Sequence, residues 1–183
     1  MQTLGLRRDT YDWSEKGRRS IVAYDADWEK SFENESDQVR HYIGHLVMDI
    51  QHVGSTSVPG LHSKPIIDIA VAVSDAEVIS QCRGPLCTLS YINRGNMGEN
   101  GGYLFVKESE PNVITHHLHI VAITDPQWDK YLLFRDALTA DITLRERHVG
   151  LKKKLQRRYS QDGKGYTTAK SDFIRETLKN INS

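Results

Sequence analysis

The sequence predicts an α/β (α+β) fold in which a mixed β-sheet is followed by a helical C-terminal half. Short apolar runs bounded by turn residues fill the chain as far as residue 123 and are typical of strands. Beyond Pro126 the apolar residues recur at helical spacing. A chain of 183 residues can bury one sizeable core. We therefore predict a single domain over residues 1–183, with an α/β core at about 20–124 and a packed helical subdomain at about 125–183.

The first expected elements are a short strand over 21–24 and a helix that Asp25 or Asp27 can cap. A strand over 47–53 follows, and a tight loop over 54–60 comes after it. The helix before this strand has an apolar stripe, formed by Trp28, Phe32, Val39, Ile43 and Leu46.

The central strand of the expected sheet covers residues 66–73 and is almost continuously apolar, as a strand buried on both faces would be. A helix over 76–83 then leads to a strand over 88–92. The glycine-rich run 93–102 is expected to be a loop or hairpin tip. Two further strands complete the mixed sheet, over 103–107 and 114–123.

The C-terminal half is expected to hold helices over 128–138, 144–159 and 167–181, each with an apolar stripe that needs a partner. We expect them to pack on the sheet and to close one wall of a cleft. Residues 143–183 carry 11 Lys and Arg against 4 Asp and Glu, although the whole chain has a net charge of zero. Anionic ligands are therefore expected to bind near this C-terminal segment. The alternative for any one of these basic residues is a solvated helix position.

The composition, with 38% hydrophobic and 26% charged residues, is typical of a soluble globular protein. The sequence contains no apolar stretch long enough for a bilayer, and residues 1–20 are polar, so we expect a cytoplasmic protein with no membrane partner. The sequence contains two cysteines, Cys82 and Cys87, and no second pair that would complete a zinc site. Free thiols of a reducing compartment are therefore expected at both positions.

Asp68 is the first candidate functional residue. Side chains alternate along a strand, so Asp68 shares a face with Ile66 and the small Ala70 and Ala72. The other face carries Ile67, Ile69, Val71 and Val73. An ionised carboxylate in so apolar a strand is costly unless it is paired, hydrogen-bonded or bound to a cation. The alternative is an Asp at a strand end that accepts backbone N–H groups.

Polar groups on either side of this strand complement the acid. Gly54, Ser55 and Thr56 leave a strand in a tight loop, where backbone N–H groups and hydroxyls can hold a phosphate. Such tripeptides also make plain turns. On the later strand His117 and His119 share a face and can hold a metal or donate to phosphate, or they can be structural.

Several motifs resemble those of the GrpB family, a branch of the nucleotidyltransferase superfamily. The resemblance extends over about residues 20–178 and includes the segments His52-Val53-Gly54-Ser55-Thr56-Ser57-Val58-Pro59-Gly60-Leu61, Lys64-Pro65-Ile66-Ile67-Asp68-Ile69, His116-His117-Leu118-His119-Ile120-Val121, Phe134-Arg135-Asp136 and Ala169-Lys170-Ser171. In the superfamily a Gly-Ser loop holds the nucleoside triphosphate, and acids on the strands hold metal ions.

The resemblance assigns Gly54 and Ser55 to the phosphate loop and Asp68 to the first acid. Ala70 stands where the second acid is usual, and histidines stand on the strand that normally carries the third. Hard Mg²⁺ prefers oxygen ligands, whereas a histidine-rich site suits Mn²⁺ or Zn²⁺ better. The expected cofactor is therefore a divalent metal, Mg²⁺ or Mn²⁺ with Zn²⁺ possible, and the expected ligand or substrate is a nucleoside triphosphate.

The implied function is metal-dependent transfer of a nucleotidyl group from a nucleoside triphosphate to an acceptor that the sequence does not identify. Asp68 is the expected catalytic residue, and it shares the metal with His117 and His119. The expected residues for the nucleotide and its phosphates are Gly54, Ser55, Thr56, Arg135, Lys152, Tyr166 and Lys170.

Two alternatives stand beside this function. A module that binds a nucleotide or another phosphorylated small molecule without turnover is favoured by the missing second acid. A metal-dependent phosphoester hydrolase would use the same histidines to orient water. Transfer is favoured over binding if another acid folds back within reach of Asp68, the candidates being Asp49, Glu99, Glu108 and Glu110.

Overall fold

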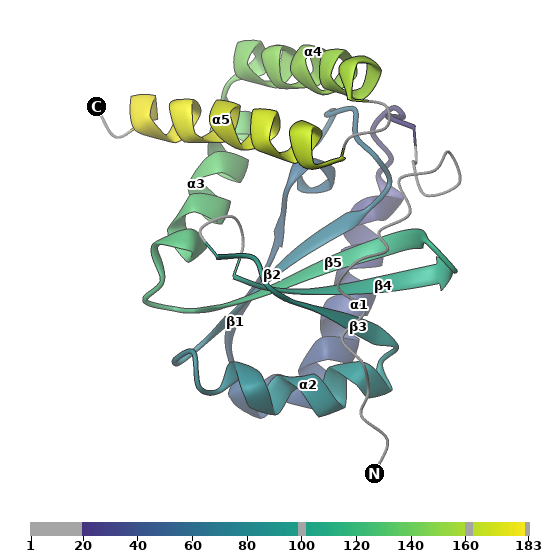
Figure 1. Cartoon of the computed structure of the whole chain (residues 1–183), viewed down its shortest axis with the longest axis vertical. Helices are drawn as coiled ribbons and strands as arrows, with labels where there is room; N and C mark the ends of the chain where they lie inside the picture. The colour runs from purple at the N-terminus through teal and green to yellow at the C-terminus, as the bar shows by residue number, and fades with distance from the viewer. Residues whose placement is uncertain (1–19, 99–101, 160–162, 182–183) are drawn as a thin grey trace.

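The computed structural model describes residues 20–98, 102–159 and 163–181 (Figure 1). Its centre is one five-stranded sheet with the order β1-β2-β5-β4-β3. β2 and β5 run parallel and the other neighbours run antiparallel, so the predicted mixed sheet is confirmed. The strands are β1 (Val47–Val53), β2 (Ile67–Val73), β3 (Tyr91–Asn96), β4 (Tyr103–Glu110) and β5 (Val113–Ala122).

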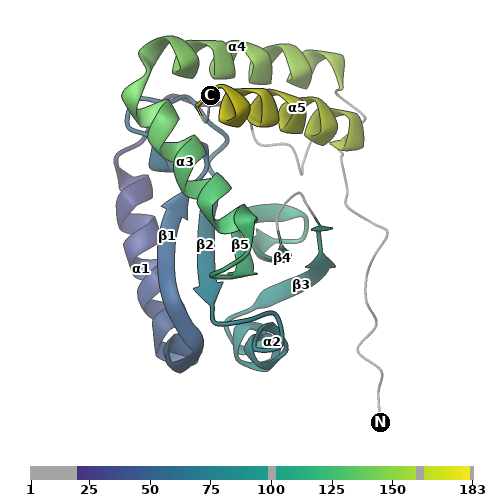
Figure 2. The same cartoon turned by 90° about the vertical axis from the view of Figure 1, so that its left-hand side faces the viewer.

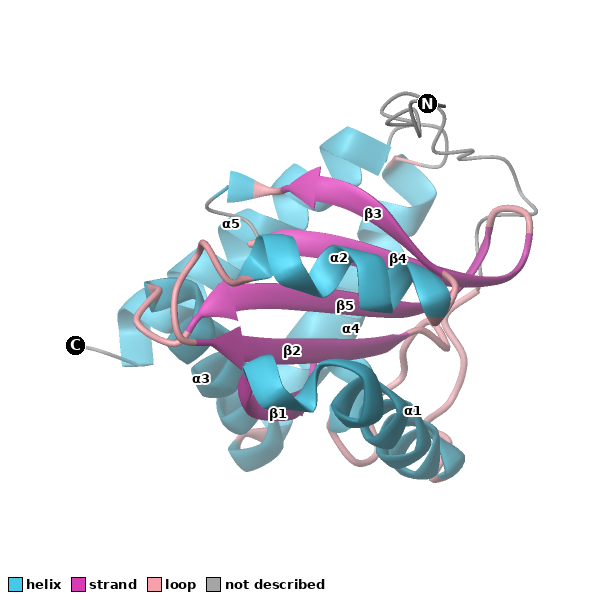
Figure 3. Cartoon of the chain, turned by 90° about the horizontal axis from the view of Figure 1, so that it is seen from below, coloured by secondary structure: helices cyan, strands magenta, loops and turns pink. Residues whose placement is uncertain are grey.

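Helices cover both faces of the sheet. α1 (Asp27–Ile43) and α2 (Ile79–Thr88) lie on one face, as the view from below shows (Figure 3). α3 (Pro126–Ala140) crosses the other face of the sheet (Figure 2). α4 (Ile142–Arg158) and α5 (Gly163–Ile181) lie beyond the C-terminal end of α3. Two short 3-10 turns, η1 (Gly44–Leu46) and η2 (Ser55–Ser57), precede and follow β1.

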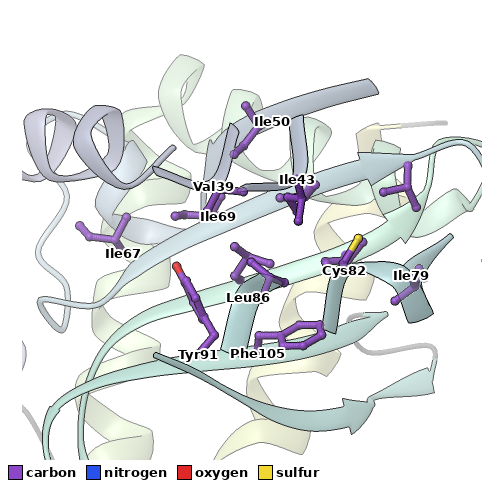
Figure 4. Close-up of a cluster of buried hydrophobic side chains, with 14 of the residues drawn as sticks. Val39, Ile43, Ile50, Ile67, Ile69, Ile79, Cys82, Leu86, Tyr91 and Phe105 are labelled. Atoms are coloured by element: carbon purple, nitrogen blue, oxygen red, sulfur yellow. The ribbon is translucent and has the colours of Figure 1, made fainter. Parts of the chain in front are cut away.

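The main core lies between the sheet and the helices α1 and α2. β2 contributes Ile67 and Ile69, labelled in Figure 4, together with Val71 and Val73. All four side chains are at most 4% exposed. The opposite side chains of β2, Ala70 and Ala72, pack instead with Trp128 of α3. The expected division of β2 into a bulky face and a small face is therefore present.

A third apolar cluster joins the helical half to the loop between β1 and β2. Val58 and Leu61 of that loop pack among residues of the last three helices, which are Phe134, Leu138, Leu144 and Leu178. This packing fixes the loop against α4 and α5. That the helices and the sheet form one cooperative domain stays a prediction.

Several element boundaries differ from those expected from the sequence. The expected strand over 21–24 is only an isolated bridge between Val22 and Ser63. α2 covers 79–88 instead of 76–83, because burial of Cys82 and Leu86 carries the helix through Pro85, which by itself is a helix breaker.

The expected strand over 88–92 begins later, at Tyr91, and continues into the expected loop. A register shift between Asn93 and Gly95 lets the strand pass this point, where Gly95 has a φ of 91°. The middle of that expected loop, with Glu99, lies outside the described residues. Cys82 and Cys87 are free thiols. Within 20–98, 102–159 and 163–181, every helix is too short or too polar to cross a membrane.

Candidate functional site

The loop after β1 brings a glycine backbone against the carboxylate near the start of β2. The antiparallel pairing of β1 and β2 places Val53 opposite Asp68. Gly54 follows with φ 70° and ψ −165°, a conformation that is essentially restricted to glycine. A Cβ at this position would meet Oδ2 of Asp68 and lie 2.9 Å from its Cβ and Cγ. Only glycine therefore permits this close approach of loop and acid.

Two histidines of β5 lie beside the same carboxylate. The parallel register pairs Asp68 with His117 and Ala70 with His119, so the three polar side chains share one face of the sheet. The distance from His117 Nδ1 to Asp68 Oδ1 is 2.9 Å. One donor atom from each of Asp68, His117 and His119 lies within 4.8 Å of the others. The cluster is partly open, since the side chains of Asp68 and His117 are 27% and 26% exposed.

The electrostatic surroundings keep Asp68 ionised. Partial burial opposes its charge, but the hydrogen bond from His117 and the nearby His117, Lys170 and His119 side chains outweigh burial. They hold the pKa of this carboxyl below its usual value. At neutral pH the site therefore presents a carboxylate that can accept a cation.

Lys152 of α4 reaches the loop from the other side. Its Nζ lies 3.1 Å from Ser55 Oγ and donates to the carbonyl oxygen of His62 at 2.8 Å. The residue is only 4% exposed. Burial, with the neighbouring cations Lys170 and Lys64, lowers the pKa of Lys152 to about 7 against the opposing attraction of Asp68. Lys152 therefore lies against the loop between β1 and β2 and is not a solvated helix position.

His148 contacts the same serine and is the residue that sequence reasoning missed. Its Nε2 is 3.3 Å from Ser55 Oγ, and the residue is 0% exposed. The ring stacks on Phe173 and meets Phe134 edge-on, with both ring centroids 5.5 Å away. Burial lowers the pKa of His148 to about 2, so the imidazole is neutral. A histidine within the apolar stripe of α4, four residues before Lys152, was the available signal.

Thr56 and Arg135 are engaged away from the carboxylate. The Thr56 hydroxyl is buried, donates to the carbonyl oxygen of Ile66 at 3.2 Å and lies 3.1 Å from His52 Nε2. Arg135 Nη1 donates to Gln51 Oε1 at 3.0 Å and to the carbonyl oxygen of His52 at 3.2 Å. Both side chains therefore fix β1 and its loop in place.

Tyr166 and Lys170 lie one turn apart on α5. Lys64, in the loop before β2, places its Nζ 5.1 Å from the centroid of the Tyr166 ring. Lys170 is close enough to lower the pKa of Asp68 and of Lys152. This part of α5 therefore contributes a cation and an aromatic ring near the site.

Among the residues that the structure describes, no further acid joins Asp68. Asp49 accepts from the backbone N–H of Ile50 and from Gln51 further along β1. Glu108 pairs with Arg94 at 3.2 Å, and Glu110 is exposed. Asp68 with His117 and His119 is the group that can hold a metal within these described ranges.

Comparison with known proteins gives the chain a family. The family described as GrpB protein matches residues 19–180. The glutamate-rich protein GrpB of Alkalihalophilus pseudofirmus is 31% identical over 169 residues, covering 91% of this chain and 97% of that protein. The UPF0157 protein YqkA of Bacillus subtilis is 30% identical over 176 residues, covering 96% of this chain. The chain spans about half of that relative, 51% of its length.

Solved structures agree with this family and show the wider fold. The conserved protein GrpB from Enterococcus faecalis matches with a TM-score of 0.76 and 27% identity, covering 90% of this chain and 100% of that one. The Cid1 poly(U) polymerase, in a structure bound to MgATP, matches with a TM-score of 0.53 and 13% identity, covering 78% of this chain and 46% of that one. The second likeness shows the fold alone, which is nucleotidyltransferase-like.

Proposed function

The chain belongs to the GrpB family, and from this premise we propose that it transfers a nucleotidyl group from a nucleoside triphosphate to an acceptor in a metal-dependent reaction. The observation that carries the proposal is the contact between the two parts of the site. Gly54 lies against Asp68, so a phosphate held by the loop lies beside the acid. A cytoplasmic location is part of the proposal, because the free thiols Cys82 and Cys87 suit a reducing compartment.

The donor set of Asp68, His117 and His119 fits one divalent transition metal. One carboxylate and two imidazoles suit Mn²⁺ or Zn²⁺ better than Mg²⁺. Asp68 Oδ1 and His117 Nδ1 are 2.9 Å apart. The ligand atoms of Asp68, His117 and His119 all lie within 4.8 Å of one another, so the three side chains could share one ion. A bound metal would supply Lewis-acid stabilisation of negative charge on the phosphate oxygens.

The chain's own groups then have distinct tasks. The Gly54–Ser55 turn offers backbone N–H groups and a hydroxyl to the phosphates. Lys170 approaches from the helical half and offsets the phosphate charge, and Lys152 contacts the Ser55 hydroxyl of the loop. Tyr166 offers a ring for the nucleotide. Thr56 and Arg135 support the loop from β1 and α3, because their polar atoms are engaged there.

A second candidate is a module that binds a nucleotide without turnover. The specific observation in its favour is Ala70, whose partner across the parallel ladder is His119. An imidazole therefore stands beside the position where the superfamily pattern has a second acid. One carboxylate in place of two or three weakens the charge available to hold a pair of hard metal ions.

Calorimetry tests the site itself. Mn²⁺ alone, ATP alone and ATP with Mn²⁺ are titrated into the wild type, Asp68→Asn and Asp37→Asn. Asp37 is an exposed acid of α1 and serves as the matched control. Loss of a ligating carboxylate is expected to weaken Mn²⁺ binding by about 100-fold or more, since changes to outer-shell partners alone cost 10–100-fold. Equal Mn²⁺ affinity in the folded wild type and Asp68→Asn would refute the metal site.

Turnover separates the two candidates. The four ribonucleoside triphosphates are incubated with Mn²⁺, the protein and a cell extract that supplies acceptors, and pyrophosphate release is measured. We expect release that depends on Asp68. Metal-dependent ATP binding without pyrophosphate release would leave the binding module as the function.

A further inference from the structure

The loop after β1 contains a serine whose hydroxyl lies between the nitrogen atoms of two buried side chains. Ser55 Oγ lies 3.1 Å from Lys152 Nζ and 3.3 Å from His148 Nε2. Both residues come from α4, one turn apart. Lys152 is 4% exposed and His148 is 0% exposed. We propose that Ser55 is a nucleophile, that Lys152 takes its proton, and that His148 is the residue that positions the hydroxyl. The substrate class, a nucleoside triphosphate, rests on the proposed function.

The surroundings of His148 decide which way its bond to Ser55 runs. Nδ1 of this ring is buried and has no hydrogen-bond partner in the described part of the chain. A buried N–H group without an acceptor is rarer and more costly than a lone pair without a donor. The ring proton therefore belongs on Nε2, which donates to Ser55 Oγ. The serine proton must then point to another acceptor.

Lys152 provides that acceptor when its amine is neutral. A neutral amine has two N–H groups and one lone pair, so Nζ can donate to the His62 carbonyl at 2.8 Å and accept from Ser55. Because burial lowers the pKa of Lys152 to about 7, a large share of the molecules hold the neutral amine at neutral pH. The hydrogen-bond counts at both nitrogens thus favour proton transfer from Ser55 to Lys152.

The charged groups that face Lys152 come from several elements. Lys170 of α5 and Lys64 of the loop before β2 oppose its protonation, Asp68 of β2 favours it, and His148 of α4 is neutral. Burial is the largest influence. Lys170 and Lys64 can therefore offset the negative charge of a phosphorus centre while Lys152 serves as the base.

The first chemical step balances with a nucleoside triphosphate as its only co-reactant. Ser55 Oγ forms a bond to the α-phosphorus while the bond from that phosphorus to the bridging oxygen breaks and pyrophosphate leaves. The hydroxyl proton passes to Lys152 Nζ and then to the departing pyrophosphate. In the second step the acceptor hydroxyl attacks the same phosphorus. Lys152 takes the acceptor's proton and returns it to Ser55 Oγ as that oxygen leaves.

A serine-reactive fluorophosphonate probe tests the nucleophile without a metal or a nucleotide. The reaction joins Oγ to the probe's phosphorus and releases fluoride, and tandem mass spectrometry locates the labelled residue. We expect the label on Ser55. Ser57 is the control within the same loop, because its hydroxyl donates to the Gly54 carbonyl at 2.7 Å. Labelling of Ser57 equal to that of Ser55, or no label on Ser55 in the folded wild type, would overturn the proposal.

Variants of α4 separate a base from a simple phosphate-binding cation. Lys152→Arg keeps a positive charge but removes the titratable amine, so the labelling rate is expected to fall by about 100-fold or more. His148→Phe keeps a ring between Phe134 and Phe173 but removes the donor, and should cost about tenfold. His148→Gln restores a donor and should recover most of the rate. Wild-type labelling by Lys152→Arg would show that Lys152 is not the base.

The pH dependence supplies a signature that a structural role would not produce. The wild-type labelling rate should rise about tenfold per pH unit below pH 7 and level off above it, following the neutral fraction of Lys152. A flat profile would contradict the proposal. Incubation with ATP and Mn²⁺ should add one adenylyl group, the mass of AMP less one water, to Ser55, and Ser55→Ala should not gain it. Probe labelling of Ser55 without any nucleotide binding would retain the nucleophile and reject the proposed function.

Discussion

The two faces of the sheet use the same kinds of residue in opposite ways. On the face covered by α1 and α2, polar groups are paired: Lys107 Nζ lies 2.9 and 3.0 Å from the Glu35 carboxylate, and His116 Nε2 lies 4.0 Å from it. One residue further along β5, His117 faces α3 to α5 and meets the partly open Asp68. The alternation of a strand therefore separates a buried set of paired groups from a partly open polar cluster over a single residue.

Two lysines show the same difference: Lys107 is half-buried on the closed face, which α1 and α2 cover, and Lys152 is buried on the open side, which faces α3 to α5. Lys107 on the closed face has a carboxylate partner in Glu35. Lys152 on the open side is bonded to a hydroxyl and a carbonyl, neither of which carries a charge. A buried cation without a nearby counter-ion lowers its pKa, and a group with a pKa near 7 can exchange protons under physiological conditions. The open side thus keeps a titratable amine where the closed side keeps an ion pair.

The largest expected difference between the faces is in stability. Ile69 points into the closed face and is 0% exposed. Ile69→Ala is expected to lower the free energy of unfolding by about 2–5 kcal/mol, because it removes apolar contacts and leaves a cavity. Asp68→Asn, one residue away on the open face, should cost about 1 kcal/mol or less, since its hydrogen bond to His117 is partly exposed. Urea unfolding at pH 7.5 measures both.

Metal titration of the same two variants completes the comparison. Ile69→Ala should bind Mn²⁺ like the wild type at temperatures where it is folded, whereas Asp68→Asn should not. If Asp68→Asn destabilised the fold as much as Ile69→Ala, the separation of the two faces would be wrong.

Gly54→Ala is expected to lower both the stability of the fold and the binding of ligands at the site. The φ of 70° and ψ of −165° cost a non-glycine residue about 1–3 kcal/mol, and the new Cβ would also displace Asp68. Gly60→Ala is the matched control, because Gly60 has a φ of 78° but open space around its Cβ position. We expect both variants to lose stability in urea and only Gly54→Ala to lose Mn²⁺ and ATP binding in calorimetry. Equal binding by the two variants would show that the contact with Asp68 has no role.

The sequence predicts those parts of the site that depend on strand periodicity. Asp68, His117 and His119 lie on one face because a period of two and a parallel register decide it. The contact of Ser55 with His148 depends instead on how α4 docks on the loop, 93 residues further along the chain. The helical spacing predicts that His148 lies on the apolar stripe of α4, but it does not predict which part of the chain packs against that stripe. The same reason explains α2, where tertiary burial overrides the local effect of Pro85.

The smallest expected effect is a pH dependence that originates from His148 on the open side. Burial lowers the pKa of this ring from 6.5 to about 2, so below pH 6.5 the unfolded chain binds a proton that the folded chain does not. Stability is therefore lost as the pH falls from 6.5 towards 2, and at pH 5.5 the loss is about 1.4 kcal/mol.

His148→Phe should remove this part of the difference in unfolding free energy between pH 7.5 and 5.5, measured in urea. The lowered pKa values of His52 and His116 act in the same direction and remain in the variant. His45→Phe, at an exposed histidine, should leave the wild-type difference unchanged. An unchanged difference in His148→Phe would mean that the ring is protonated in the folded chain, and the hydrogen bond from its neutral form to Ser55 would then have to be abandoned.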